Sequence, residues 1–65
     1  MNRRRKKQIF DEAERVFGSR EDAKIWLNTP QRGLGFRKPV EMLDTYIGAE
    51  RVQAYLSAIG AGNVW

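Results

Sequence analysis

The sequence predicts an all-α fold, a small bundle of about four short helices with a Gly/Pro-rich loop between the second and the third. Two observations support this prediction. Apolar residues recur at offsets of three and four, the spacing of one face of an α-helix, and we identify no strand. Glycines and prolines divide the chain into segments of helical length. Such short helices are unstable alone, so they must pack against one another or against a partner.

The first helix is expected over residues 9–17, where apolar residues form one stripe: Ile9, Phe10, Ala13, Val16 and Phe17. Gly18 ends this helix, because glycine readily adopts the left-handed backbone found just past a helix end. Ser19 follows, with Asp22 three residues further on, and this capping-box pattern predicts the start of a second helix. That helix buries Ala23, Trp26 and Leu27. It ends before Pro30, because the residue preceding a proline disfavours helical geometry.

The segment from Pro30 to Lys38 is expected to be a loop. Gly33 and Gly35 flank Leu34, which we expect to return into the core as an apolar plug. Pro39 suits the first turn of a third helix. The inward-facing residues of that helix are expected to be Val40, Met42 and Leu43.

Gly48 is expected to break the chain before a last helix, in which Val52, Leu56 and Ile59 recur at spacings of four and three, with Tyr55 beside them. Gly60 and Gly62 then release a flexible C-terminal tail, residues 60–65. We therefore divide the chain into a basic N-terminal arm, residues 1–8, and a helical domain, residues 9–65.

The basic arm contains an unbroken run of positive charge: Arg3, Arg4, Arg5, Lys6 and Lys7. These are five of the 12 basic residues, so seven remain against eight acidic residues in the rest of the chain. The run could contact nucleic acid phosphates, dock on an acidic partner or be a solvated tail. A small nucleic-acid-binding protein acting through this arm is therefore the alternative function.

Composition argues against catalysis. The chain has no cysteine and no histidine, which excludes thiolate metal sites and removes the usual metal ligand and general base. The carboxylates are spaced like a solvated helix face or like caps, so we expect no enzyme and no cofactor. No apolar run approaches the roughly 20 residues that span a bilayer, and we expect a soluble, cytoplasmic protein.

The C-terminal sequence "GAGNVW" places Trp65 after two glycines. Its indole could fold back onto the core, or it could serve as an anchor in a partner, because tryptophan is enriched among interface hot spots. The sequence leaves both arrangements open.

The order of the short stretches "VFGS", "EDA", "WL", "TP", "LG", "EML" and "GAERV" resembles the toxin-binding domain of the Xre/MbcA/ParS antitoxins, over about residues 10–65. The resemblance implies a small helical bundle that neutralises a RES-domain toxin, which degrades NAD or transfers its ADP-ribose. It also implies that the antitoxin covers the active-site cleft of the toxin, with its C-terminal segment nearby. A homodimer or a higher hetero-oligomer stays open.

On this resemblance, the expected toxin-binding residues are Leu34, Phe36, Arg37, Asn63, Val64 and Trp65. Trp65 and its carboxylate would occupy the cleft, where a toxin arginine could pair with the carboxylate. The family often has glycine where Phe36 stands and Ser or Thr where Lys38 stands. Phe36 is then an added contact residue, and the missing cap weakens the third helix by about 1 kcal/mol. Many members also carry an upstream helix-turn-helix domain that represses their own operon. Residues 1–65 do not include such a domain, so the resemblance does not imply autorepression for this sequence.

Overall fold

A computed structural model describes residues 3–62 of the chain. Its elements are α1 (Arg3–Phe17), α2 (Arg20–Leu27), the short 3-10 helix η1 (Arg32–Leu34), α3 (Pro39–Met42) and α4 (Tyr46–Gly60). Within these residues there is no strand, and one isolated antiparallel bridge joins Gln31 to Arg37. The predicted all-α bundle with four α-helices is confirmed.

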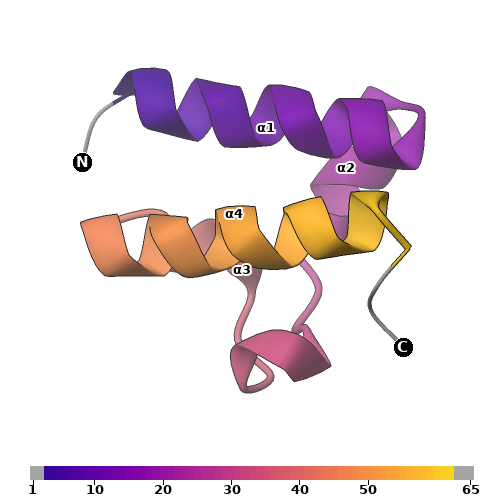
Figure 1. The fold of residues 1–65 in the computed structure, drawn as a ribbon. Coiled ribbons are helices and arrows are strands. Elements are labelled where there is room, and N and C mark those ends of the chain that lie inside the picture. Colours follow the sequence, from indigo (N-terminus) through magenta and orange to yellow (C-terminus); the bar gives the residue numbers. More distant parts are fainter. Residues whose placement is uncertain (1–2, 63–65) are drawn as a thin grey trace.

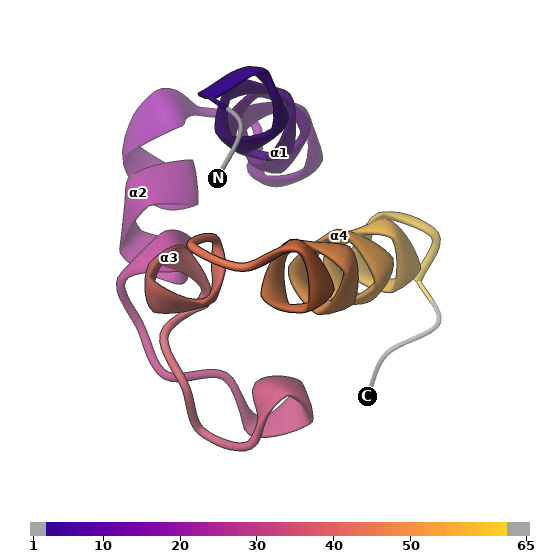
Figure 2. The same cartoon turned by 90° about the vertical axis from the view of Figure 1, so that its left-hand side faces the viewer.

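The two long helices, α1 and α4, lie side by side and run in the same direction (Figure 1). Helix α2 turns away from the end of α1. Helix α3 lies beneath α2 and beside α4 (Figure 2). The loop that carries η1 projects on the side of α4 opposite to α1 (Figures 1 and 2). This arrangement leaves the η1 loop in contact with α4 and away from α1.

The core forms where α1, α2 and α4 meet. Its buried apolar side chains are Ile9, Ala13, Ala23, Trp26, Leu27, Leu34, Leu43, Ala49, Val52 and Leu56. A row of rings continues this core toward the η1 loop. Phe17 and Trp26 have ring centroids 5.4 Å apart, and Trp26 stacks on Tyr55 at 6.2 Å. Aromatic pairs in this range add to the stability that their burial provides.

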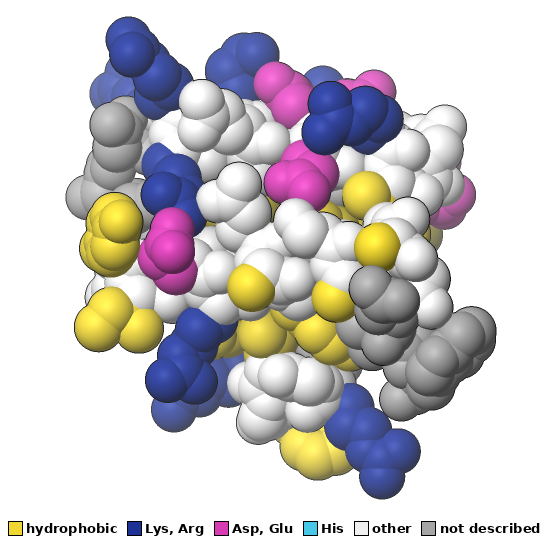
Figure 3. Space-filling model, viewed as in Figure 1, with side chains coloured by type: hydrophobic (Ala, Val, Ile, Leu, Met, Phe, Trp, Pro, Cys, Tyr) yellow, Lys and Arg dark blue, Asp and Glu magenta, His cyan; other side chains and the backbone are white. Residues whose placement is uncertain are grey.

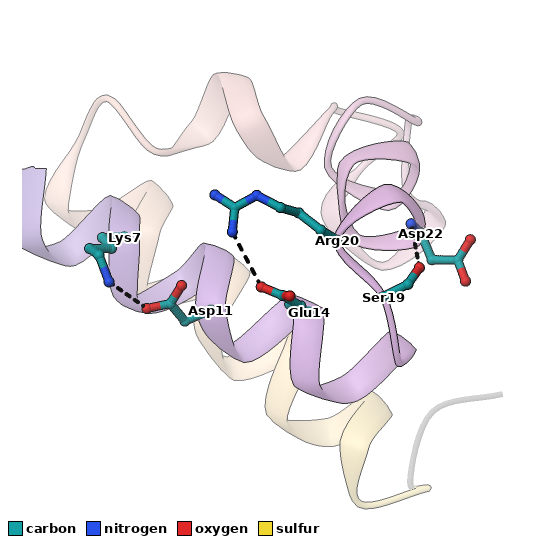
Figure 4. A network of polar contacts seen from close by, with 6 residues as sticks. All are labelled: Lys7, Asp11, Glu14, Ser19, Arg20 and Asp22. Carbon is teal, nitrogen blue, oxygen red and sulfur yellow. Dashed lines mark hydrogen bonds and ion pairs between the residues drawn. The ribbon is translucent and has the colours of Figure 1, made fainter.

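The turn between α1 and α2 follows the sequence prediction. Gly18 adopts a left-handed φ of 88°, and the Ser19 hydroxyl accepts a hydrogen bond of 3.1 Å from the backbone N–H of Asp22. An ion pair of 3.4 Å between Arg20 and Glu14 bridges the two helices (Figure 4). The predicted glycine stop and serine cap are both confirmed.

Helix α1 begins earlier than expected, because residues 3–8 are helical and continue into the rest of the helix without a break. Ion pairs explain this extension. Arg5 pairs with Glu50 of α4, and Lys6 pairs with Asp44 at 3.1 Å, just before α4. Lys7 pairs with Asp11 one turn further along α1, at 3.1 Å (Figure 4). These carboxylates offset the unfavourable placement of basic side chains at the positive end of a helix.

The expectation that Gly48 breaks the chain is wrong. Gly48 lies in the first turn of α4, and its backbone N–H donates to the Thr45 hydroxyl at 2.9 Å, which caps the helix. A Cβ at this position would lie only 2.0 Å from the carbonyl oxygen of Met42. Glycine is therefore needed here for close approach between α3 and α4, and not for a turn.

Helix α3 begins at Pro39, as predicted, but it is only four residues long. Lys38 precedes it in an extended conformation and provides no side-chain cap, as expected from its side chain. Leu43 is buried and Met42 packs against the core, whereas the inward orientation expected for Val40 is wrong, because 40% of it is exposed. Helix α4 continues through Gly60, and the tail residues 63–65 lie outside the described part of the chain.

Candidate functional site

The loop from Gln31 to Arg37 is closed by its own backbone. The N–H of Gln31 donates to the carbonyl of Arg37 at 3.1 Å, and the N–H of Phe36 donates back to the carbonyl of Gln31 at 2.8 Å. The side-chain amide of Gln31 also donates to the carbonyl of Trp26 at 3.2 Å, which ties the loop to the end of α2. The loop is therefore a closed unit fixed on the bundle.

Phe36 projects from this loop with an unusual backbone. Its φ is 62°, which follows a φ of 69° at Gly35, so two consecutive residues are left-handed. This region costs a residue with a side chain about 1–2 kcal/mol. The ring is 70% exposed and buries little surface that could offset the strain. An exposed aromatic ring on a strained backbone is typical of a residue kept for contact with a partner.

A groove of about 790 Å³ lies between the η1 loop and α4. On the loop side it is lined by the Gly33–Gly35 stretch and Arg37, and on the helix side by Arg51, Ala54 and Tyr55; Met42 of α3 also lines it. Figure 3 shows hydrophobic side chains in the hollow beneath α4, flanked by Lys and Arg side chains. The groove thus combines an apolar interior with basic edges.

Close packing fixes the spacing of the groove walls. A Cβ at Gly33 would lie 2.3 Å from the Tyr55 ring, so the loop backbone rests directly against this ring. Tyr55 is held in turn by its stacking on Trp26. The groove is therefore a feature of the packed bundle, and it does not depend on the loop alone.

The charges around the groove are not neutralised within the described residues. Arg37 and Arg51 make no ion pair there, and neither do Arg32 of the loop and Lys38, which follows the loop. No carboxylate lines the groove in this part of the chain. Residues 31–38 contain three basic residues and no acidic one. The loop and the facing turn of α4 consequently form a positive surface.

The family model of the antitoxin Xre/MbcA/ParS C-terminal toxin-binding domain matches residues 12–62. The chain belongs to this antitoxin family. No curated protein and no solved structure gave a match. The match spans the C-terminal part of α1 from residue 12 and every later element, including the η1 loop and its groove. The protein is thus an antitoxin-type domain whose partner is a toxin.

The structure brings together some of the toxin-binding residues expected from the sequence. Leu34 is 9% exposed and belongs to the core, as the predicted apolar plug, and its remaining surface faces the groove. Phe36, two residues further along the chain, is exposed and is not among the lining residues, whereas Arg37 lines the groove. The other three expected residues, Asn63, Val64 and Trp65, lie outside the described residues.

The side of this antitoxin's groove that α4 forms was not predicted from the sequence. Arg51 and Tyr55 line the groove from α4, but Arg51 was given no role from the sequence, and Tyr55 was only placed beside the inward residues of the last helix. Their spacing of four places them on one face of α4, which is the signal that could have linked them. What they face, the η1 loop, could not be inferred from that spacing.

The basic run of the antitoxin domain is largely used within the fold. Arg5, Lys6 and Lys7 are held in ion pairs with acidic side chains, and the family match begins after them, at residue 12. The hydrogen bond with Glu50 raises the pKa of the Arg5 guanidinium above its ordinary value, and burial opposes this shift. Binding of nucleic acid phosphates by this run, Arg3 to Lys7, would have to compete with these pairs.

Residues 3–62 contain no group of three or more His, Cys, Asp or Glu side chains that could hold a metal ion. Within the same residues, none of the antitoxin's helices combines the length and the apolar character needed to cross a membrane.

Proposed function

We propose that this chain is the antitoxin of a bacterial type II toxin–antitoxin pair and that it inhibits a RES-type toxin by covering its active site. The family match over residues 12–62 carries this proposal. The toxin would consume NAD or transfer its ADP-ribose, so the pair would act in the cytoplasm. The antitoxin would contribute no chemistry of its own and would act by excluding the substrate.

The proposed contact surface consists of the η1 loop and the C-terminal residues. It comprises Leu34, Phe36, Arg37, Asn63, Val64 and Trp65. The exposed ring of Phe36 supports this assignment, because a solvated aromatic ring on a left-handed backbone has no stabilising role within the bundle. Aromatic rings and arginines are also the residue types enriched among interface hot spots.

The test is co-expression with a RES-domain toxin encoded beside this chain, scoring bacterial growth and cellular NAD. The full chain should restore both, and it should co-purify with the toxin. A chain lacking Asn63, Val64 and Trp65 should co-purify less well and should leave NAD depleted. Full protection by that shortened chain would reject the role given to the C-terminal residues. Unchanged NAD loss in the presence of the full chain would reject the proposed function.

A further inference from the structure

We propose that the groove between the η1 loop and α4 is a docking site for an acidic segment of the toxin. The segment would carry at least two carboxylates and an apolar side chain between them. Arg37 and Arg51 would pair with the carboxylates, while Leu34, Met42 and Tyr55 would contact the apolar side chain. This inference rests on the proposed function for the identity of the partner, but the groove can be tested without it.

Charge is the first argument. Four of the basic residues in the bundle are paired with carboxylates across or along its helices, through Asp11, Glu14, Asp44 and Glu50. The two groove arginines come from different elements and have no such pair within the described residues. Both arginines line the same groove and no carboxylate lines it, so an occupant that supplies negative charge is attracted to it.

The chemistry of arginine further limits which kinds of occupant fit the groove. A guanidinium group presents planar, paired N–H donors that match a carboxylate in a bidentate arrangement. The lining of the groove contains one arginine from the η1 loop and one from α4, together with the apolar side chains of Leu34, Met42 and Tyr55. A peptide segment with acidic side chains flanking an apolar one meets both requirements at once.

The size and packing of the groove suit a peptide segment. Its volume of about 790 Å³ falls within the range of roughly 300–1,000 Å³ found for clefts that hold ligands. Its walls are set by the contact of Gly33 with the Tyr55 ring and by the stacking of that ring on Trp26. A groove that is already formed spares the occupant part of the ordering cost of binding.

The first experiment uses the full chain, labelled with ¹⁵N, and a capped peptide of sequence Ala-Glu-Leu-Glu-Leu-Asp-Ala. Its control replaces each acidic residue with the matching amide. The acidic peptide should shift the backbone signals of Gly33, Gly35 and Arg51, and the effect should weaken between 50 and 300 mM salt. Equal shifts with the amide peptide, or shifts confined to α1, would overturn the proposal.

Charge reversal provides the matched comparison. The double variant Arg37→Glu with Arg51→Glu should weaken peptide binding at least about 30-fold, since repulsion replaces attraction at both positions. The control double variant, Arg15→Glu with Lys24→Glu, changes the net charge equally at exposed positions away from the groove, and should leave affinity within about twofold. Equal losses in both double variants would show a response to net charge alone and would overturn the proposal.

The chain's own terminus is the rival occupant. A chain ending at residue 62 tests this. It could show the same signal changes at Gly33 and Arg51 that the peptide causes in the full chain, or it could bind the peptide much more tightly. Either result would mean that residues 63–65 compete for the groove and that the toxin segment does not occupy it. Unchanged groove signals in that shortened chain support the proposal. These peptide measurements need no toxin. They can therefore fail while the co-expression test succeeds, and they can succeed while that test fails.

Discussion

Phe36 allows the strain of the η1 loop and its contact role to be measured separately. Both Phe36→Ala and Phe36→Gly remove the exposed ring, but only glycine is free to adopt φ of 62° without strain. The left-handed backbone costs alanine about 1–2 kcal/mol. The greater freedom of glycine in the unfolded chain offsets about 0.4–1 kcal/mol of that difference. The glycine variant should therefore be more stable than the alanine variant by about 1 kcal/mol.

In a domain of this size, about 1 kcal/mol corresponds to a difference of about 4–8 °C in melting temperature. Thermal unfolding followed by circular dichroism measures it directly. If the two variants melt at the same temperature, the left-handed conformation of residue 36 is not the one adopted in solution, and the strain argument fails.

Binding should respond differently from stability. Both variants should lose affinity for the toxin by about tenfold or more, because they lose the same ring. Ile25→Ala, which removes an exposed apolar side chain from α2, is the matched control and should keep its affinity. Titration calorimetry with the purified toxin gives these numbers. A Phe36→Gly variant that is stabilised and still binds as tightly as the original chain would show that Phe36 makes no contact.

Three further changes test the bundle itself, each by thermal or urea unfolding. Gly48→Ala should destabilise the domain by about 2 kcal/mol or more, since its Cβ would meet the carbonyl oxygen of Met42. Helix propensity alone predicts a gain in stability of about 1 kcal/mol, so the sign of the measured change distinguishes the two effects. Ser19→Ala should cost about 1 kcal/mol through the lost cap, whereas Ser57→Ala should change stability by less than about 0.5 kcal/mol; equal losses would contradict the cap. Asp44→Asn should lower the melting temperature at low salt and have little effect at high salt, because its ion pair is exposed; an effect independent of salt would count against the pair.

Local sequence was sufficient where local interactions decide the structure. Gly18 ends one helix and Ser19 starts the next through contacts within four residues, and Pro39 begins α3 for the same kind of reason. The burial of Leu34 was predictable from its position between two glycines. The candidate site was predicted only in part, since the loop residues were recognised but the facing turn of α4 was not.

The sequence by itself determined the helical class, the apolar stripes and most of the helix ends, because each depends on residues a few positions apart. Tertiary structure decided the rest. Arg5 is helical because Glu50, 45 positions away, neutralises its charge. Gly48 is needed for close packing because the carbonyl oxygen of Met42 lies against it. The positive groove also depends on tertiary structure. Arg5 and Lys6 of the N-terminal run pair with distant carboxylates, whereas within the described residues no ion pair neutralises the groove arginines.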